Sequence, residues 1–373
     1  MNHRIEFLYL SEKDMKDAGV LDIKECVDVM DEVFQIMGKG DYLMGGPKRN
    51  DHGLMIWFPD HPLGPQMPVN GPDRRFMSLI AYLGGRFNIT GNKWYGSNIE
   101  NPKKGLPRSI LTVLLNDPDT GAPLAFMSAN LLSAIRTGAV PGVAAKHLAR
   151  EDSSIVGLIG AGVINRASLF AICESIPHIS EVQIFDLNKD KAAQLAQEVS
   201  NKYPVNCTIV ENIKLCVENS DIISVATSGH RKPEIKNEWL KKGSLLILTG
   251  SANLTEDIFK KNRIVVDNWM MHKAWLRDAK EHSEGIKSII SWAMTGQLLK
   301  MVDEGKYDEK HVIDLADIVL DKTTARIDKN ETTIFLTGGL PLEDLAWGYE
   351  IYQNALKKGI GKKLILWDEP HWL

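Results

Sequence analysis

The chain has 373 residues and a mass of 41.6 kDa, about two and a half times the length of a typical ~150-residue domain, so we expect two domains. Hydrophobic residues make up 44% of the chain and charged residues 25%, which excludes a disordered chain and a coiled coil. The 44 Lys and Arg residues are balanced by 48 Asp and Glu residues. The chain therefore lacks the cationic field that a nucleic-acid partner requires.

The sequence also argues against a membrane protein and against a metal centre. No apolar run approaches the roughly 20 residues that cross a bilayer, and the N-terminus is charged where a signal peptide would be apolar. We therefore expect a cytoplasmic protein without a membrane partner. The 4 cysteines form no CxxC pair and the 10 histidines show no HExxH spacing, so neither a disulfide framework nor a bound metal is expected.

The first part of the chain mixes helices with an antiparallel hairpin. Residues 23–37 have apolar side chains at helical spacing and stop at a glycine, which predicts an amphipathic helix. Residues 111–115 and 123–127 flank a Pro- and Gly-containing turn and predict a β-hairpin. The Ala-rich stretch 129–150 predicts a helix with a break or kink at Pro141.

From residue 151 short β-branched runs alternate with helical stretches. Six strands are predicted, at 154–159, 181–185, 207–210, 221–226, 244–249 and 263–266. This alternation is typical of an α/β Rossmann fold, with a doubly wound parallel sheet. A strand-like piece at 332–339 and a helix at 342–358 follow, and we expect that helix to return to the first domain. The predicted organisation is a Rossmann domain at 151–321 and a discontinuous α+β substrate-binding and dimerisation domain formed by 1–150 and 322–373.

A phosphate-binding loop is predicted where the first of these strands ends. Gly160 permits a tight turn, and Gly162 lets a pyrophosphate approach the N-terminus of the following helix. Asp186 ends the next strand, 24 residues after Gly162 in the sequence. This is close to the spacing expected of a carboxylate that binds the adenosine ribose and repels a 2'-phosphate. We therefore expect NAD rather than NADP, although Asp186 could also be a simple strand cap. The residues expected to hold the cofactor are Gly160, Gly162, Val163, Ile164, Asn165, Asp186, Thr227 and Ser228. Asn165 replaces the third glycine of the GxGxxG pattern.

Several ordered motifs resemble those of the ornithine cyclodeaminase and mu-crystallin family. They are GNK at 91–93, NPKKGLP at 101–107, LNDPDTGAPLA at 115–125, AIRTGA at 134–139, the GLIGAG loop, and GLPLEDLA at 339–346. The resemblance implies an NAD(P)-dependent enzyme, or a relative of one, that acts on amino acids and their imines. It also implies a homodimer that forms through the first domain, whose antiparallel strands would otherwise leave an open edge.

By the same resemblance, the substrate carboxylate is bound by Arg49 and Arg136, and Lys93 is the catalytic residue. A guanidinium binds a carboxylate through paired hydrogen bonds. A lysine beside two arginines and away from water would have a lowered pKa and could exchange a proton with the substrate nitrogen. The alternative is that these three residues are ordinary surface charges.

Two departures from the family bear on the reaction. Ser228-Gly229 stands where cyclodeaminases carry a catalytic aspartate, which favours simple hydride transfer, as in amino-acid dehydrogenases and ketimine reductases. The alternatives are an ornithine cyclodeaminase, with His230 or Glu234 replacing the aspartate, and a non-catalytic small-ligand-binding protein. The Pro- and Gly-rich loop at 59–72, extended through residue 75, is either a surface excursion or an element of substrate choice, in which Arg74 or Arg75 reaches a second carboxylate.

Overall fold

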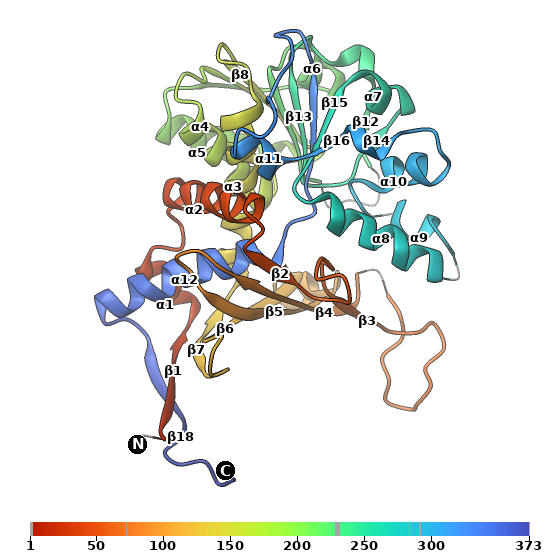
Figure 1. Ribbon diagram of the computed structural model, residues 1–373. Coiled ribbons are helices and arrows are strands. Elements are labelled where there is room, and N and C mark those ends of the chain that lie inside the picture. Colours follow the sequence, from red (N-terminus) through yellow and green to blue (C-terminus); the bar gives the residue numbers. More distant parts are fainter. Residues whose placement is uncertain (1–2, 72, 228–231, 283, 291, 373) are drawn as a thin grey trace. The chain divides into compact units, whose positions relative to one another are not determined.

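A computed structural model describes residues 3–71, 73–227, 232–282, 284–290 and 292–372, which form two compact units (Figure 1). The first unit consists of Met1–Asp22, Lys39–Ser133 and Leu340–Leu373. The second unit consists of Ile23–Gly38 and Ala134–Gly339. Neither unit is a continuous stretch of chain.

The first unit contains a mixed sheet of eight strands, in the order β18-β1-β7-β6-β5-β4-β2, with β3 also paired to β4. Every pair is antiparallel except β1 with β7. The pairing of β6 with β7 confirms the predicted hairpin. The strands are β1 (Ile5–Leu10), β2 (Tyr42–Met44), β3 (Leu54–Trp57), β4 (Arg75–Leu83), β5 (Ile89–Ser97), β6 (Ser109–Asn116), β7 (Pro123–Ser128) and β18 (Lys362–Trp367).

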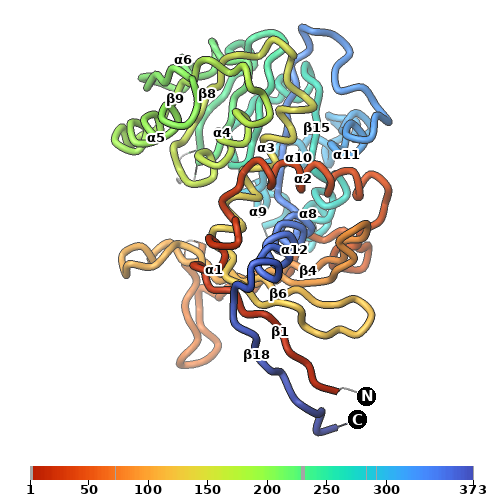
Figure 2. Tube along the Cα trace, turned by 90° about the vertical axis from the view of Figure 1, so that its left-hand side faces the viewer, coloured from red at the N-terminus to blue at the C-terminus, as the bar shows by residue number. Residues whose placement is uncertain are grey.

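Two helices pack on this sheet. Helix α12 (Pro341–Lys358) lies against β4, β5 and β6, and α1 (Glu12–Ala18) lies against α12 and β7. The prediction that the last helix returns to the first domain is therefore confirmed. A 3-10 turn, η1 (Asn101–Lys104), precedes β6. Strands β1 and β18 run side by side and carry the two chain ends, as Figures 1 and 2 show.

The second unit is built on a fully parallel sheet of eight strands, in the order β10-β9-β8-β11-β13-β17-β15-β16. The central strands are mainly apolar and are buried along their whole length, as expected of strands with helices on both faces. This confirms the doubly wound α/β fold. The strands are β8 (Ile155–Ile159), β9 (Glu181–Phe185), β10 (Asn206–Ile209), β11 (Ile222–Val225), β13 (Leu245–Leu248), β15 (Arg263–Val266), β16 (Val312–Asp314) and β17 (Thr333–Leu336), and β12 (Glu234–Ile235) pairs separately with β14 (Asn253–Leu254).

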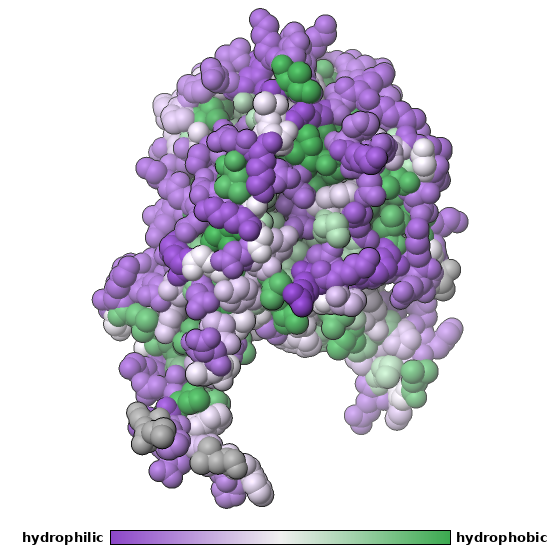
Figure 3. Space-filling model, viewed as in Figure 1, coloured by the Kyte–Doolittle hydropathy of each residue, from purple (hydrophilic) through white to green (hydrophobic). Residues whose placement is uncertain are grey.

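The helices of this unit surround its sheet, and α3 begins in the first unit. They are α2 (Ile23–Gly38), α3 (Asn130–Leu148), α4 (Val163–Ser175), α5 (Lys189–Lys202), α6 (Ile213–Glu218), α7 (Glu256–Lys261), α8 (Trp269–Glu281), α9 (Lys287–Ile290), α10 (Gly296–Asp303) and α11 (Leu315–Val319), with 3-10 turns η2 (Asn237–Trp239) and η3 (Glu309–His311). In the described ranges, no helix is long and apolar enough to span a membrane. Figure 3 shows a mainly hydrophilic surface on the face toward the viewer.

Three details differ from the sequence analysis. The strand predicted at 332–339 is β17, and it lies between β13 and β15 instead of in the first domain. The helix predicted at 23–37 is α2, and it packs in the second unit, on α4 and α11. Helix α3 continues through Pro141 without a break. Local patterns identified these elements, but only their tertiary contacts determine the unit to which each belongs.

Trp347 tests how strongly α12 holds the first unit together. Its side chain is fully buried, and Nε1 donates a hydrogen bond to the Val20 carbonyl oxygen at 3.3 Å. We predict that Trp347→Ala lowers the free energy of unfolding by about 3–5 kcal/mol in urea titrations, because a large cavity replaces the ring. The matched control is Trp372→Ala, at a ring that is 86% exposed, which should change stability by less than about 0.5 kcal/mol. Equal effects of the two substitutions would contradict this role of Trp347.

Candidate active site

A pocket of about 600 Å³ lies at the carboxyl ends of β8, β9 and β11 in the second unit. Ile159 ends β8, Phe185 ends β9, and Ala226 directly follows β11; all three line the pocket. From β8 the chain proceeds to β9 and β10 on one side and then crosses to β11 on the other. The pocket therefore occupies the topological switch point, where doubly wound sheets bind their ligands.

The loop between β8 and α4 leaves backbone exposed to this pocket. Gly160 has a φ of +98°, and a Cβ atom there would lie 2.7 Å from the Ala226 carbonyl oxygen, so only glycine fits. Gly162 is the N-cap of α4, without a side-chain cap, and a Cβ there would meet no atom within 4 Å. The first N–H groups of α4 therefore have neither an intrahelical partner nor a capping side chain, as anion binding requires.

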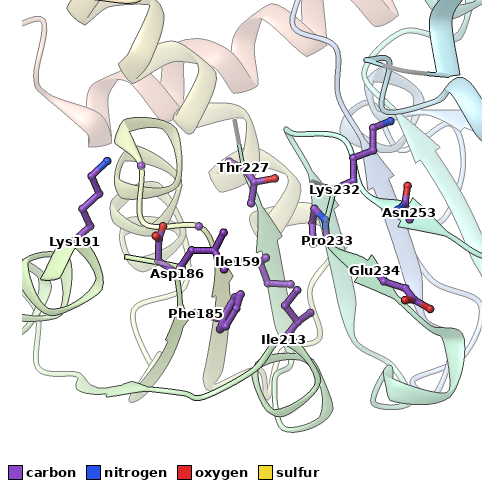
Figure 4. A pocket seen from close by; sticks show the side chains of 14 residues that line it. Ile159, Phe185, Asp186, Lys191, Ile213, Thr227, Lys232, Pro233, Glu234 and Asn253 are labelled. Atoms are coloured by element: carbon purple, nitrogen blue, oxygen red, sulfur yellow. The ribbon is translucent and has the colours of Figure 1, made fainter. Parts of the chain in front are cut away.

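Asp186 is held rigidly beside this loop. Its Oδ2 accepts a hydrogen bond from the Ala161 N–H at 2.6 Å, and its Oδ1 accepts one from the Asn188 N–H at 2.7 Å. Figure 4 shows Asp186 and Lys191 on one side of the pocket, and Lys232, Glu234 and Asn253 on the other. The carboxylate thus lies where a ribose hydroxyl could replace one of its backbone partners.

Asn165 faces the protein interior. Its Nδ2 donates to the carbonyl oxygens of Ile159 at 2.9 Å and Gly160 at 2.7 Å, and its Oδ1 accepts from Ser224 Oγ at 2.8 Å. The side chain is fully buried. The amide therefore braces the glycine turn, and a cofactor could contact Asn165 only through its backbone.

The predicted cofactor residues divide into three groups. Gly160, Gly162, Asp186 and Thr227 line the pocket, whereas Val163, Ile164 and Asn165 do not, and Ser228 lies outside the described residues. Of the two alternative bases, Glu234 lines the pocket, and His230 lies outside the described residues.

Two lysines in the pocket were missed by sequence reasoning. Lys191, in the first turn of α5, and Lys232, just before β12, both line the pocket. Burial lowers the pKa of Lys232, whose Nζ donates to the Ile290 carbonyl oxygen at 2.7 Å. Neither residue belongs to a recognised motif, so only the general rule that loops after parallel strands line the site could have indicated them.

Lys93 forms a buried ion pair within the first unit. Its Nζ lies 3.0 Å and 3.1 Å from the two carboxylate oxygens of Asp344 and donates to Ser133 Oγ at 2.8 Å. Lys93 is 4% exposed and Asp344 is fully buried in the first turn of α12. Asp344 therefore gives Lys93 a buried counter-charge, in addition to the two arginines that the sequence analysis placed beside it. Asp344 is a residue that the sequence analysis quoted in a motif without giving it a role.

Arg136 is buried beside the start of the same motif. It lies on α3 and is 5% exposed. Gly339 has a φ of +76°, and a Cβ atom on it would lie 2.7 Å from Arg136 Nη1. The GLPLEDLA motif therefore supports two predicted residues: Gly339 leaves room for the guanidinium of Arg136, and Asp344 pairs with Lys93.

A buried aspartate holds the turn next to Arg136. Asp267 Oδ2 accepts hydrogen bonds from the N–H groups of Gly338 at 2.7 Å and Gly339 at 2.9 Å, and from Thr337 Oγ1 at 2.9 Å. Burial acts to raise the pKa of Asp267, but His272, 2.7 Å away, and the hydrogen bonds from Thr337 and the Asn268 N–H hold it below its usual value. The turn is thereby fixed by a charged acceptor.

Arg49 occupies a different setting. It lies on an exposed turn between β2 and β3, with a φ of +60°. Within the described ranges its guanidinium makes no hydrogen bond or ion pair, so nothing joins it to Lys93 in this structure. Its role in carboxylate binding remains a prediction. Among all the residues that the structure describes, no group of three His, Cys, Asp or Glu residues is arranged to hold a metal ion.

Comparisons with known proteins agree with these motifs. The profile of the ornithine cyclodeaminase/mu-crystallin family matches residues 20–359. The chain is 29% identical to N-((2S)-2-amino-2-carboxyethyl)-L-glutamate dehydrogenase of Staphylococcus aureus, over 97% of this chain and 99% of that protein. It is 32% identical to alanine dehydrogenase of Archaeoglobus fulgidus, over 96% of this chain and 98% of that protein.

Among solved structures, the chain resembles Delta(1)-pyrroline-2-carboxylate reductase of Thermococcus litoralis in complex with NADH and L-proline. The TM-score is 0.77 at 30% sequence identity, and the match covers 95% of this chain and 99% of that one. The matching profile spans both units, and the loop, lysine and arginine motifs occur in the order expected of the family. The chain is a member of the ornithine cyclodeaminase/mu-crystallin family.

Proposed function

We propose that this protein is an NAD(H)-dependent oxidoreductase that transfers hydride between the nicotinamide and the α-carbon of an amino acid or its imine. The observation that carries the proposal is the switch-point pocket, with its bare helix N-terminus and with Asp186 at the end of β9. Relatives at about the same identity over nearly the whole chain are dehydrogenases of amino acids and a reductase of a cyclic imine. Their names share one chemistry, the interconversion of a C–N single bond and a C=N double bond.

The pocket suits NAD in shape and charge. The N–H groups at the start of α4 are placed to bind the pyrophosphate, and the Asp186 carboxylate to accept from the ribose hydroxyls. When bound, the dinucleotide supplies or accepts the hydride, and the protein supplies binding, orientation and electrostatics. The fixed negative charge of Asp186 disfavours the 2'-phosphate of NADP.

Lys93 and Arg136 are the residues that we assign to the substrate. In this assignment Arg136 binds the α-carboxylate through paired hydrogen bonds, which fixes the orientation of the α-carbon. Lys93, held in place by Asp344, donates a hydrogen bond or a proton to the substrate. Arg49, with its exposed guanidinium, is assigned to the carboxylate as a second ligand. The absence of an aspartate at Ser228-Gly229 in the sequence favours this hydride transfer over cyclodeamination.

We also propose a homodimer that forms through the first unit. One face of its sheet is covered by α12, whereas the opposite face exposes large apolar side chains. On that opposite face Phe76 stacks on Trp94 at a centroid distance of 5.8 Å, and Tyr9 on Phe126 at 6.4 Å. An exposed apolar area of this kind marks a protein interface, and a second copy of the chain offers the same face. The apolar sheet face comprises Tyr9, Phe76, Ile80, Trp94, Ile110 and Phe126.

Replacing Lys93 tests the catalytic assignment. We predict that Lys93→Met abolishes NADH oxidation with cyclic imines and with mixtures of 2-oxo acids and amines, while NADH affinity stays within about threefold, a change below ~0.7 kcal/mol. Because Lys93→Met leaves the Asp344 carboxylate buried without its lysine, the double variant Lys93→Met/Asp344→Leu should show the same loss of turnover in a better folded protein. Wild-type turnover in either folded variant would remove Lys93 from the mechanism.

Replacing Asp186 tests the cofactor assignment. We predict that Asp186→Ser lowers the ratio of kcat/KM for NADH to kcat/KM for NADPH by about tenfold or more, or ~1.4 kcal/mol, because the charge facing a 2'-phosphate is lost. The matched control is Asp190→Ser, on the exposed first turn of α5, which should leave the ratio unchanged. A wild-type enzyme that prefers NADPH would contradict the assignment.

A charge on the apolar sheet face tests the homodimer. We predict that the wild-type protein sediments as a dimer and that Phe126→Glu shifts it toward the monomer, because a dimer would bury the carboxylate. Leu215→Glu, at a side chain of α6 that is 41% exposed, is the control and should remain dimeric. Sedimentation velocity at several concentrations distinguishes the two states, and a monomeric wild type would contradict the proposal.

A further inference from the structure

Arg75 lies on the same face of the first unit's sheet as Lys93. In the antiparallel register of β4 and β5, Arg75 is opposite Ser97, Met77 is opposite Tyr95, and Leu79 is opposite Lys93. Residues two and four apart on a strand share one face, and directly opposed residues point the same way. Arg75 and Lys93 therefore project from one surface, with Tyr95 between them.

Tyr95 links the two cationic groups. Lys93 Nζ lies 5.8 Å from the centre of the Tyr95 ring, and the guanidinium carbon of Arg75 lies 5.9 Å from the same centre. The two charges are thus separated by no more than these two distances placed end to end. A small molecule that meets Lys93 can therefore reach Arg75 with a second functional group.

The guanidinium of Arg75 is held by its surroundings before any ligand binds. It lies over the Trp57 ring at 5.2 Å, and its Nη2 is 3.5 Å from the Tyr95 hydroxyl oxygen. Its Nη1 forms an ion pair with Asp73, and the side chain is only 25% exposed. Packing between two rings restricts the rotamers of the Arg75 side chain. Little conformational entropy is therefore lost when its guanidinium binds an anion.

The charges around Arg75 leave a positive excess. Asp73 Oδ2 accepts from Arg108 Nε at 2.6 Å and from Ser97 Oγ at 2.5 Å, while Asp73 Oδ1 faces Arg75. One carboxylate thus lies between two guanidinium groups. Arg75 Nε is buried and has no hydrogen-bond partner in the described part of the chain. An incoming carboxylate would balance the charge at the outer edge of the guanidinium, while Arg108 and Ser97 retain Asp73.

From these contacts we infer that Arg75 binds a second carboxylate of the substrate, so that the enzyme prefers amino acids or imines carrying two acidic groups. The inference rests on the proposed function, because it extends the same substrate surface. Arg74, its neighbour, has different contacts: its Nη1 donates to the Val69 carbonyl oxygen at 3.0 Å, and its guanidinium lies over the Phe58 ring at 5.8 Å. In the described part of the chain, Arg74 makes no hydrogen bond or cation–π contact with Tyr95. Arg75 thus becomes a specificity-determining residue.

The second carboxylate can belong to the side chain or to a substituent on nitrogen, and matched substrates distinguish the two. With NAD, L-glutamate is compared with L-glutamine, and L-aspartate with L-asparagine. With NADH, pyruvate plus glycine is compared with pyruvate plus methylamine. L-Alanine and Delta(1)-pyrroline-2-carboxylate, each with one carboxylate, report the proposed function itself. The variants are Arg75→Gln and Arg75→Lys, with Arg74→Gln as the matched control, and NADH binding shows that each variant is folded.

In at least one pair, we expect the wild-type kcat/KM to be about tenfold or more higher for the substrate with two carboxylates. The substrate with one carboxylate lacks the charged hydrogen bond to Arg75, and such a loss has about this effect. Arg75→Gln should reduce that preference to about twofold, mainly through KM; Arg75→Lys should retain part of it, and Arg74→Gln all of it. Two outcomes would overturn the role of Arg75 and leave the proposed function standing. The first is turnover of L-alanine or the cyclic imine without a preference in any pair. The second is a preference that survives Arg75→Gln. No turnover of any substrate with NAD(H) overturns both.

Discussion

Lys93 and Asp344 form an ion pair that is almost completely shielded from water, and such a pair is tolerated only when both charges are held close together and their hydrogen bonds are satisfied. Three elements of the first unit meet this condition. Strand β5 carries the lysine, the first turn of α12 carries the aspartate, and Ser133 at the start of α3 accepts a further hydrogen bond. The sheet order, which places β5 beneath α12, and the burial of Trp347 in that helix therefore serve to position one ammonium group.

The chain segment that follows β17 serves both units at once. Asp267 fixes the backbone of Gly338 and Gly339, and the missing side chain of Gly339 gives space to Arg136. Five residues farther on, Asp344 neutralises Lys93. A glycine and an acidic residue at this spacing are therefore required for two separate physical reasons, close approach of a guanidinium and compensation of a buried charge.

The sequence predicted local patterns well and long-range partners poorly. Alternating β and α stretches predicted the doubly wound sheet, and the glycine turn predicted the pocket, because both depend on residues close together in the chain. Strand β17 was assigned to the wrong domain because its pairing with β13 and β15 joins segments far apart in sequence. The buried partner of Lys93, Asp344, lies 251 residues away in the sequence and was therefore not foreseen. The side-chain amide of Asn165, which the sequence analysis placed at the cofactor, bonds to the turn that precedes it and leaves only the backbone for that role.

The two halves of the proposed mechanism place different demands on the sequence. The proposed cofactor contacts in the second unit are the backbone of the glycine turn, the N-terminus of α4 and the Asp186 carboxylate. The substrate surface of the first unit depends instead on charged side chains such as Arg75, which long loops and strand ends supply. A single substitution there changes the net charge that a substrate meets but leaves the buried Lys93–Asp344 pair in place. Relatives of similar overall identity can therefore reduce or oxidise C–N bonds in different amino acids.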